Sequence, residues 1–364
     1  MTVVPIKHRV NEWPGSEAVL FVTGYDEVRA ALGESRLIIH KPLTGNTEET
    51  KGITQGSRRI APLSSVLSEH LAAREVASLA TEVQTLTDEF ARNLQREGQG
   101  DAIEGLASPL PLNIMARLLG LSKAPAGMLR PLFDRITAGH DFGATTVEQQ
   151  QGRMALQMLV RWLNHALKTS VEPSPLMTAI RATAEEKGME PAIVHYWCAM
   201  LLYAGSTTTR DFIGNILAAL LARQDLVHVL LREPDALDSA IEELLRVEGP
   251  VRGLMRQATE DLPLGGQTAS RGQLVCLMLI DANRDPARFA EPERWDLRRS
   301  PNPHLALGAN LTYCLGSHLA RMEAKNVLAN LLPLLPYIRS NDTAAWSTSR
   351  LLRGRTQLRL SWHG

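Results

Sequence analysis

The chain has 364 residues, with 39 Lys and Arg against 39 Asp and Glu, so its formal net charge is zero. This balance gives no support for nucleic-acid binding, which usually needs an excess of basic residues. The 44% hydrophobic and 21% charged residues exclude the disordered and fibrous classes. No apolar run reaches the roughly 18 residues that a membrane span needs, and residues 1–29 show no secretory signal pattern. We therefore expect a cytoplasmic protein without a membrane span.

The predicted elements begin with a short strand and a helix within residues 19–32, separated by a turn at Gly24. Residues 35–62 are rich in Gly, Thr, Ser and Lys and show no sustained period, which predicts a long loop. From residue 68 to about 232, nearly every window fits helical spacing. Breaks in this helical region are expected at 98–100, 109–111, 123–125, 139–143 and 171–175. A further helix is expected over 234–247.

The pattern changes after this helix. Residues 261–281 carry three glycines between short β-prone runs and predict hairpins, whereas residues 283–303 contain four prolines and predict a loop. Residues 316–332 return to helical spacing. We predict a mainly α protein with a smaller antiparallel β portion, in a single domain over 1–364. Its expected parts are a β-rich portion at about 13–24 and 250–282, a helical body at about 68–247, and a loop and helix over 304–332.

The three cysteines, Cys198, Cys276 and Cys314, are widely spaced, which argues against a disulfide framework or a structural zinc site. Cys314 alone lies in a loop that enters a helix, where free N–H groups and the helix dipole favour a thiolate. Cys198 is expected in a helix and Cys276 in a strand, both in the core. For a single cysteine, an inert buried thiol is the commoner outcome, and a metal-bound sulfur is the alternative.

Two helical features also stand out. Glu243 and Arg246 are three residues apart and can pair, although most such pairs are exposed and weak. Gly205 precedes a run of Ser and Thr within an otherwise apolar helix, where glycine and β-branched residues are unfavourable. This irregularity indicates either the close approach of a flat ligand or tight packing against another helix.

Taken in order, these motifs resemble the cytochrome P-450 superfamily, in its soluble bacterial-type branch, over nearly the whole chain. The helix with Glu243 and Arg246 is followed by a hairpin at 261–266, by Ala-Asn-Arg-Asp-Pro at 282–286, by Pro-Asn-Pro-His-Leu at 301–305 and by Tyr-Cys-Leu-Gly at 313–316. The segments 68–74 and 319–323 are also similar to this family. The resemblance implies the cytochrome P-450 fold, a prism-like helical body that encloses haem, with the haem-binding loop and its helix at 304–332.

The resemblance also implies a set of site residues. Cys314 would be the axial thiolate ligand of the iron in haem b. Thr208 would help to deliver protons to bound dioxygen, with Thr207 and Gly205 beside it. Glu243 and Arg246 would be structural. The expected haem contacts are His70, Arg74 and Arg256, which would bind the propionates, and Ala204, Leu307, Gly308, Thr312 and Gly316. The expected substrate pocket contains Met200, Tyr203, Ala204, Val251, Arg252 and Leu254.

The sequence departs from the family pattern at several of these positions. Leu307 replaces a Phe, Asn310 replaces a Gly, and Thr312 replaces a His or Arg, so we expect one propionate contact to be weakened or replaced. Thr207 stands where the family usually has an acid, which weakens the case for ordinary proton delivery. Arg252 stands where the family usually has an apolar side chain. It either points to solvent or to a propionate, since Arg is rarely buried alone, or it binds a substrate anion.

The resemblance leads to three hypotheses for function. The first is a monooxygenase that oxidises a small molecule with dioxygen in bacterial specialised metabolism, with electrons from NAD(P)H passed through a ferredoxin reductase and a ferredoxin. The alternative, motivated by Thr207, is an atypical haem-thiolate enzyme with peroxide-driven, coupling, nitrogen-oxide or rearrangement chemistry. The third is a haem-binding protein without turnover, motivated by the altered haem loop.

Overall fold

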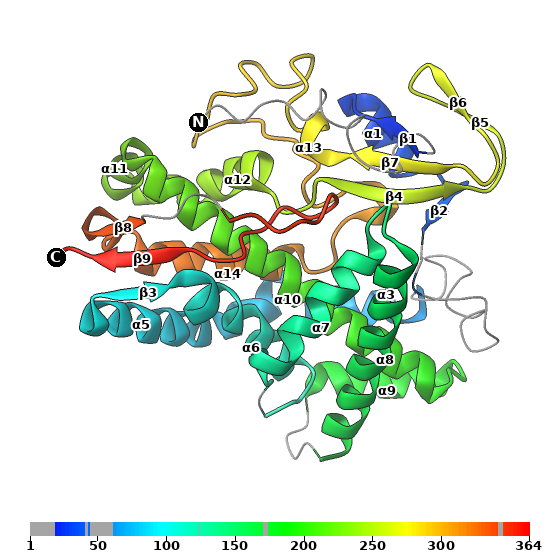
Figure 1. Ribbon diagram of the computed structural model, residues 1–364, viewed down its shortest axis with the longest axis horizontal. Coiled ribbons are helices and arrows are strands. Elements are labelled where there is room, and N and C mark those ends of the chain that lie inside the picture. The colour runs from blue at the N-terminus through cyan, green and yellow to red at the C-terminus, as the bar shows by residue number, and fades with distance from the viewer. Residues whose placement is uncertain (1–18, 41–42, 44–60, 123, 170–173, 341–344) are drawn as a thin grey trace.

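A computed structural model describes residues 19–40, 43, 61–122, 124–169, 174–340 and 345–364. Most of the predicted loop at 35–62 therefore lies outside the described residues. In Figure 1, helix α10 (Pro191–Ala222) runs through the middle of the molecule, with the largest sheet on one side and helices α6 to α9 on the other. The molecule is mostly helical with small sheets, as the sequence predicts.

The helices follow the predicted pattern closely. Gly98, with φ of 72°, ends one helix in the left-handed conformation, and Pro109 and Pro175 each begin a helix. Besides α10, the α-helices are α1 (Tyr25–Ala31), α3 (Ala61–His70), α4 (Ala73–Val76), α5 (Ala80–Glu97), α6 (Pro109–Leu118), α7 (Ala126–His140), α8 (Thr146–Thr169), α9 (Pro175–Glu186), α11 (Gln224–Arg232), α12 (Leu237–Glu248), α13 (Leu279–Ala282) and α14 (Ser317–Leu331).

The strands form three sheets within the described residues. The first has the order β1-β7-β4-β2, the second β3-β9-β8, and the third is the hairpin β5-β6. All strand pairs are antiparallel except β1 with β7, which joins the two predicted β-rich segments in parallel. The strands are β1 (Val19–Val22), β2 (Leu37–Ile39), β3 (Gln99–Asp101), β4 (Gly253–Ala258), β5 (Leu262–Leu264), β6 (Gln267–Ala269), β7 (Leu274–Met278), β8 (Ile338–Ser340) and β9 (Arg359–Trp362).

Two boundary predictions are wrong. Strand β2 lies inside the segment predicted as a loop, because it pairs with the distant strand β4 and three residues carry no period of their own. Helix α3 begins at Ala61 and not near residue 68, because Leu63 and Leu67, one turn apart, are both fully buried and extend the helix toward the N-terminus.

Helix α10 is the centre of the hydrophobic core. It packs against α6, α8, α12 and α14, and it is buried on nearly all sides, as expected for a helix that is apolar around its whole circumference. Among the described residues, no single helix is long and apolar enough to cross a membrane. The pair α10 and α11 meets that criterion only when joined, and the two helices meet at a bend of 98°.

Candidate functional site

Cys314 lies in the loop that enters α14. Its N–H donates to the carbonyl of Leu307 at 2.8 Å, and its own carbonyl accepts from the N–H of Ser317 at 3.2 Å. Cys314 is exposed, whereas Cys198 in α10 and Cys276 in β7 are fully buried. The structure thus confirms the predicted placement of all three cysteines, and it presents one accessible thiol on a loop fixed at both ends.

The groups around the Cys314 sulfur shift the pKa of the thiol in opposite directions. Although the residue is exposed, protein atoms crowd the thiol, and this desolvation raises its pKa. A hydrogen bond from the N–H of Gly316 and the positive charge of Arg321 oppose the rise in pKa. These two groups favour the thiolate, which is the form that binds a metal ion.

The loop before Cys314 keeps a left-handed backbone at two positions. Gly308 has φ of 74°, and a Cβ atom there would clash with the carbonyl of Thr312. Asn310 has φ of 52°, a conformation that Asn adopts more readily than most residues, and its side-chain amide donates to the carbonyl of Arg29 at 3.2 Å. Asn310 therefore keeps the left-handed turn at a position where the resemblance predicts Gly. Leu307 is half-buried and packs against the core.

Arg256 provides the test of whether haem fits these residues. Its side chain is buried in β4, and it donates one hydrogen bond, to the carbonyl of Met255 at 3.0 Å. Among the described residues no carboxylate lies within ion-pair distance, and burial lowers the pKa of Arg256. A buried cation without an anion is unfavourable, so a carboxylate-bearing cofactor fits here. Cys314 and Arg256 together suit a group with a metal ion and propionates.

The other residues that are expected to bind the propionates make other contacts in the structure. His70, at the end of α3, is half-buried, and its Nδ1 lies 3.0 Å from the carbonyl of Val66. Arg74 is exposed and pairs with Glu75 at 3.0 Å, so its side chain points to solvent. The hydroxyl of Thr312 donates to the carbonyl of Ala309 at 2.8 Å and is used inside the loop.

The role of position 312 can be tested by restoring the residue that the resemblance predicts. We expect Thr312→His to leave haem retention unchanged or improved, because the imidazole adds a donor for a carboxylate. The rate of haem transfer to an excess of a haem-free globin measures retention. Thr312→Val is the matched control, since it removes only the hydroxyl. Faster haem loss in Thr312→His than in Thr312→Val would show that the loop is built around Thr312.

Around Gly205, helix α10 packs against α6 on one side and is accessible on another. A Cβ atom on Gly205 would lie 2.7 Å from the sulfur of Met115 in α6, so this glycine permits close helix packing, one of the two explanations that the sequence leaves open. The hydroxyl of Thr208 donates to the carbonyl of Ala204 at 2.8 Å. Ala204 is exposed and Thr208 is half-buried, which leaves both accessible to a ligand.

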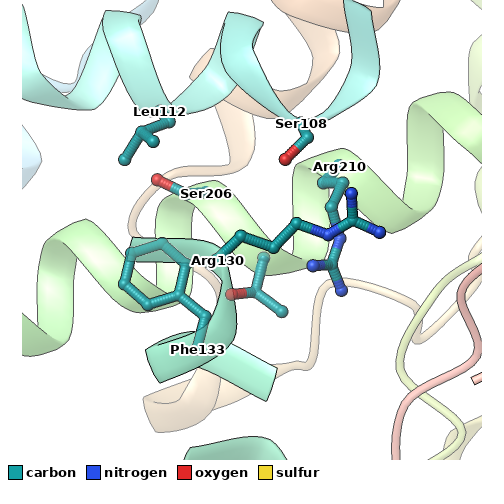
Figure 2. Close-up of a pocket in the computed structure, with 7 residues that line it drawn as sticks. Ser108, Leu112, Arg130, Phe133, Ser206 and Arg210 are labelled. Carbon is teal, nitrogen blue, oxygen red and sulfur yellow. The ribbon is translucent and has the colours of Figure 1, made fainter. Parts of the chain in front are cut away.

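Thr207 points into a different environment. Together with Ser206 it lines a small cavity between α6, α7 and α10, which Figure 2 shows with Arg130 and Arg210 at one end. Both hydroxyls are buried and have no hydrogen-bond partner among the residues that the structure describes. The cavity volume is about 10 Å³, which is enough for one water molecule. Ser108, Leu112 and Phe133 also line the cavity.

Glu243 and Arg246 are fully buried and form a bidentate pair with two contacts of 2.8 Å. Arg246 also donates to the carbonyls of Asn283 and Pro292, each at 2.8 Å, and Arg299 donates to Glu243 at 3.1 Å. The pair is therefore not one of the common exposed ones. It attaches α12 to the long loop that leads to the Cys314 segment.

A second network beside this pair was missed by the sequence analysis. Glu242, the neighbour of Glu243, accepts from Arg321 of α14 at 2.6 Å and lies 3.2 Å from His304. Burial alone would raise the pKa of Glu242, but these two partners lower it to about 2. Glu242 thus ties both ends of the segment around Cys314 to α12. Arg321 and His304 both lie in motifs that carry the resemblance, and these motifs could have identified the network from the sequence.

The expected pocket residues are spread over two elements. On α10, Tyr203 exchanges a hydrogen bond of 2.8 Å with Thr137 of α7, and burial raises its pKa to about 12, while Met200 is half-buried against the core. Near β4, three further side chains are half-buried, namely Val251, Arg252 and Leu254.

The chain is similar to known proteins over nearly its whole length. The family model described as Cytochrome P450 matches residues 167–335. The chain is 30% identical to the cytochrome P450 monooxygenase PikC of Streptomyces venezuelae over 98% of this chain and 88% of that protein. It is also 30% identical to cytochrome P450 107B1 of Saccharopolyspora erythraea over 96% and 90% of the two chains. The crystal structure of CalO2 matches with a TM-score of 0.86 at 26% identity, covering 98% of this chain and 95% of that one.

Proposed function

The chain belongs to the cytochrome P450 family, and from this premise we propose that it hydroxylates or epoxidises a small organic molecule in bacterial specialised metabolism. It is an oxidoreductase of the monooxygenase type with a haem-iron cofactor. In the proposed reaction one atom of dioxygen enters the substrate and the other leaves as water, with two electrons and two protons consumed. The electrons come from NAD(P)H through a ferredoxin reductase and a ferredoxin, in the cytoplasm.

One observation carries this proposal, namely the exposed residue Cys314 on a loop fixed by hydrogen bonds at both ends. Haem b bound at this sulfur supplies the iron chemistry that activates dioxygen. Cys314 would hold the iron, and Arg256 would compensate a propionate with its buried guanidinium. His70, Leu307, Gly308 and Gly316 complete the proposed haem contacts, whereas Arg74 would have to leave Glu75 to join them.

Thr208 is the proposed proton-handling residue. Its hydroxyl donates to the carbonyl of Ala204, so the oxygen remains free to accept a hydrogen bond from a water molecule and to hold that water for proton delivery. Thr207 has no acidic group, and its side chain lies in the cavity of Figure 2, among α6, α7 and α10. Thr208 and bound water therefore carry the proposed proton delivery.

We expect Thr208→Ala to lower product formation per electron consumed by about 100-fold, within the range of general acid–base effects. The measurement compares product with NAD(P)H consumed in the presence of ferredoxin and its reductase. Thr209→Ala, one residue along α10, is the matched control and should keep the wild-type ratio. Equal ratios in Thr208→Ala and wild type would remove Thr208 from the proposal.

The alternative function, an atypical haem-thiolate enzyme, is favoured by Thr207. Peroxide already brings its own protons and electrons, so a peroxide-driven enzyme needs no acid next to Thr208. Activity with peroxide alone that exceeds activity with the electron-transfer proteins would favour this alternative. Haem binding without either activity would leave only the third hypothesis, a haem protein without turnover.

A further inference from the structure

Two of the expected pocket residues interact with α7 or with the residue that ends it. Tyr203 on α10 bonds to Thr137 and packs edge-on against Phe133, with ring centroids 5.6 Å apart. Phe133 and Thr137 are one turn apart, and Asp141 follows one turn later at the end of the helix. Asp141 interacts electrostatically with Arg252. Helix α7 and the residue that ends it therefore lie near both Tyr203 and Arg252.

The backbone of Arg252 is fixed on two sides. Its N–H donates to the carbonyl of Leu351 at 2.8 Å, and its carbonyl accepts from the N–H of Ile280 at 3.1 Å. The preceding residue, Val251, forms an antiparallel bridge with Leu352. The side chain of Arg252 therefore projects from a rigid segment, which is a requirement for orienting a ligand.

The guanidinium of Arg252 has no partner among the described residues. The residue is half-buried, and its Nε atom is sealed from solvent without a hydrogen bond. The two terminal nitrogens are not sealed in this way. Desolvation lowers the pKa of Arg252, and the charge of Arg353 lowers it further. An anion in contact with the terminal nitrogens would offset both effects.

The neighbouring arginines are satisfied, which makes Arg252 different from them. Arg353 pairs with the carboxylate of Glu248. Arg284 donates to the carbonyl of Val247 at 2.7 Å. Both guanidinium groups therefore have partners within the protein, whereas that of Arg252 remains available to bind a ligand.

Asp141 does not neutralise Arg252. One of its carboxylate oxygens accepts from the N–H of Arg350 at 2.6 Å, and the carboxylate does not reach Arg252 within ion-pair distance. Burial raises the pKa of Asp141. Arg252 is therefore a partly buried cation without a counter-ion among the described residues.

We propose that Arg252 binds the carboxylate of the substrate, so that the enzyme acts on amphipathic organic acids whose apolar part lies along Tyr203. This inference rests on the proposed function. The two terminal nitrogens suit bidentate binding of a carboxylate, and fixing one end of the substrate positions the carbon that reacts. The class of substrate is thereby narrowed from any small molecule to free carboxylic acids.

The test measures dissociation constants of the haem-bound protein by equilibrium dialysis. The probes are dodecanoic, phenylbutanoic and adamantane carboxylic acids, each paired with the alcohol of the same carbon skeleton. We expect at least one acid to bind wild type about 10-fold more tightly than its alcohol. Arg252→Gln should weaken binding of that acid by about 30-fold or more, as for the loss of a desolvated charge partner. Alcohol binding should not change.

Two further variants control this result. Arg252→Lys keeps the charge and should retain part of the acid preference, because Lys lacks the planar fork of Arg. Arg271→Gln removes an exposed arginine in the turn between β6 and β7 and should behave as wild type.

The inference is overturned if no acid binds wild type more tightly than its alcohol, or if Arg252→Gln binds acids as wild type does. Loss of thermal stability in Arg252→Gln with unchanged acid binding would assign Arg252 a structural role instead. Failure of the proposed function is seen separately, as the absence of a thiolate-type carbon monoxide spectrum. Oxidation of an acid and its alcohol at equal rates, both unchanged in Arg252→Gln, would keep the monooxygenase and remove the acid preference.

Discussion

Cys314→Ala is expected to abolish the Soret band that marks thiolate ligation in the reduced, carbon monoxide-bound protein, and oxidation of any substrate should fall to background. The reason is that no other cysteine is placed to substitute for it. Cys198 and Cys276 are fully buried in α10 and β7, and desolvation raises the pKa of both thiols, that of Cys198 to about 12. Difference spectra of the reduced protein with and without carbon monoxide provide the measurement.

Cys198→Ala is the matched control for this experiment. Its sulfur lies in the core, 3.8 Å from the sulfur of Met177, so the substitution leaves a small cavity and costs about 1 kcal/mol of unfolding free energy. The thiolate spectrum should persist. A thiolate band that survives in Cys314→Ala and disappears in Cys198→Ala would overturn the assignment of the iron ligand and, with it, the proposed function.

The parts of the fold that the sequence predicted correctly have local causes. Gly265 and Gly266, with φ of 55° and 77°, form the turn of the hairpin β5-β6, and helical spacing predicts α14 almost to its ends. Strands β3, β8 and β9 were missed because their stability comes from distant partners. Gly100 pairs with Leu360 across most of the chain, and strands of three or four residues carry little pattern of their own.

The features of the candidate site also fall into those with a local sequence signal and those that depend on distant partners. The order of motifs identifies Cys314 and the Glu243–Arg246 pair, because each occurs in a short conspicuous pattern. Whether a side chain is satisfied depends on packing that a single sequence does not specify. Three features are of this kind: the lack of an anion beside Arg256 within the described part of the chain, the sulfur of Met115 against Gly205, and the contact of Tyr203 with α7.

The largest loss of stability is expected from Arg246→Ala. The substitution leaves the carboxylate of Glu243 buried with a reduced set of partners, and removal of one member of a buried ion pair costs about 3–5 kcal/mol. It also frees the carbonyls of Asn283 and Pro292, which accept from Arg246. Because a typical domain is stable by only about 5–15 kcal/mol, we expect a large shift of the urea midpoint, followed by circular dichroism and Soret absorbance.

The chain contains a matched control for this prediction. Glu291 and Arg294 have the same spacing and a similar contact of 2.9 Å, but both side chains are more than 60% exposed. Arg294→Ala should therefore cost less than about 1 kcal/mol, as for other surface pairs. Equal midpoints for Arg246→Ala and Arg294→Ala would show that the buried network does not stabilise the fold. A loss of Soret absorbance before helicity in Arg246→Ala would show instead that the network acts mainly on the loop around Cys314, which Glu243 supports through Asn302 and Arg299.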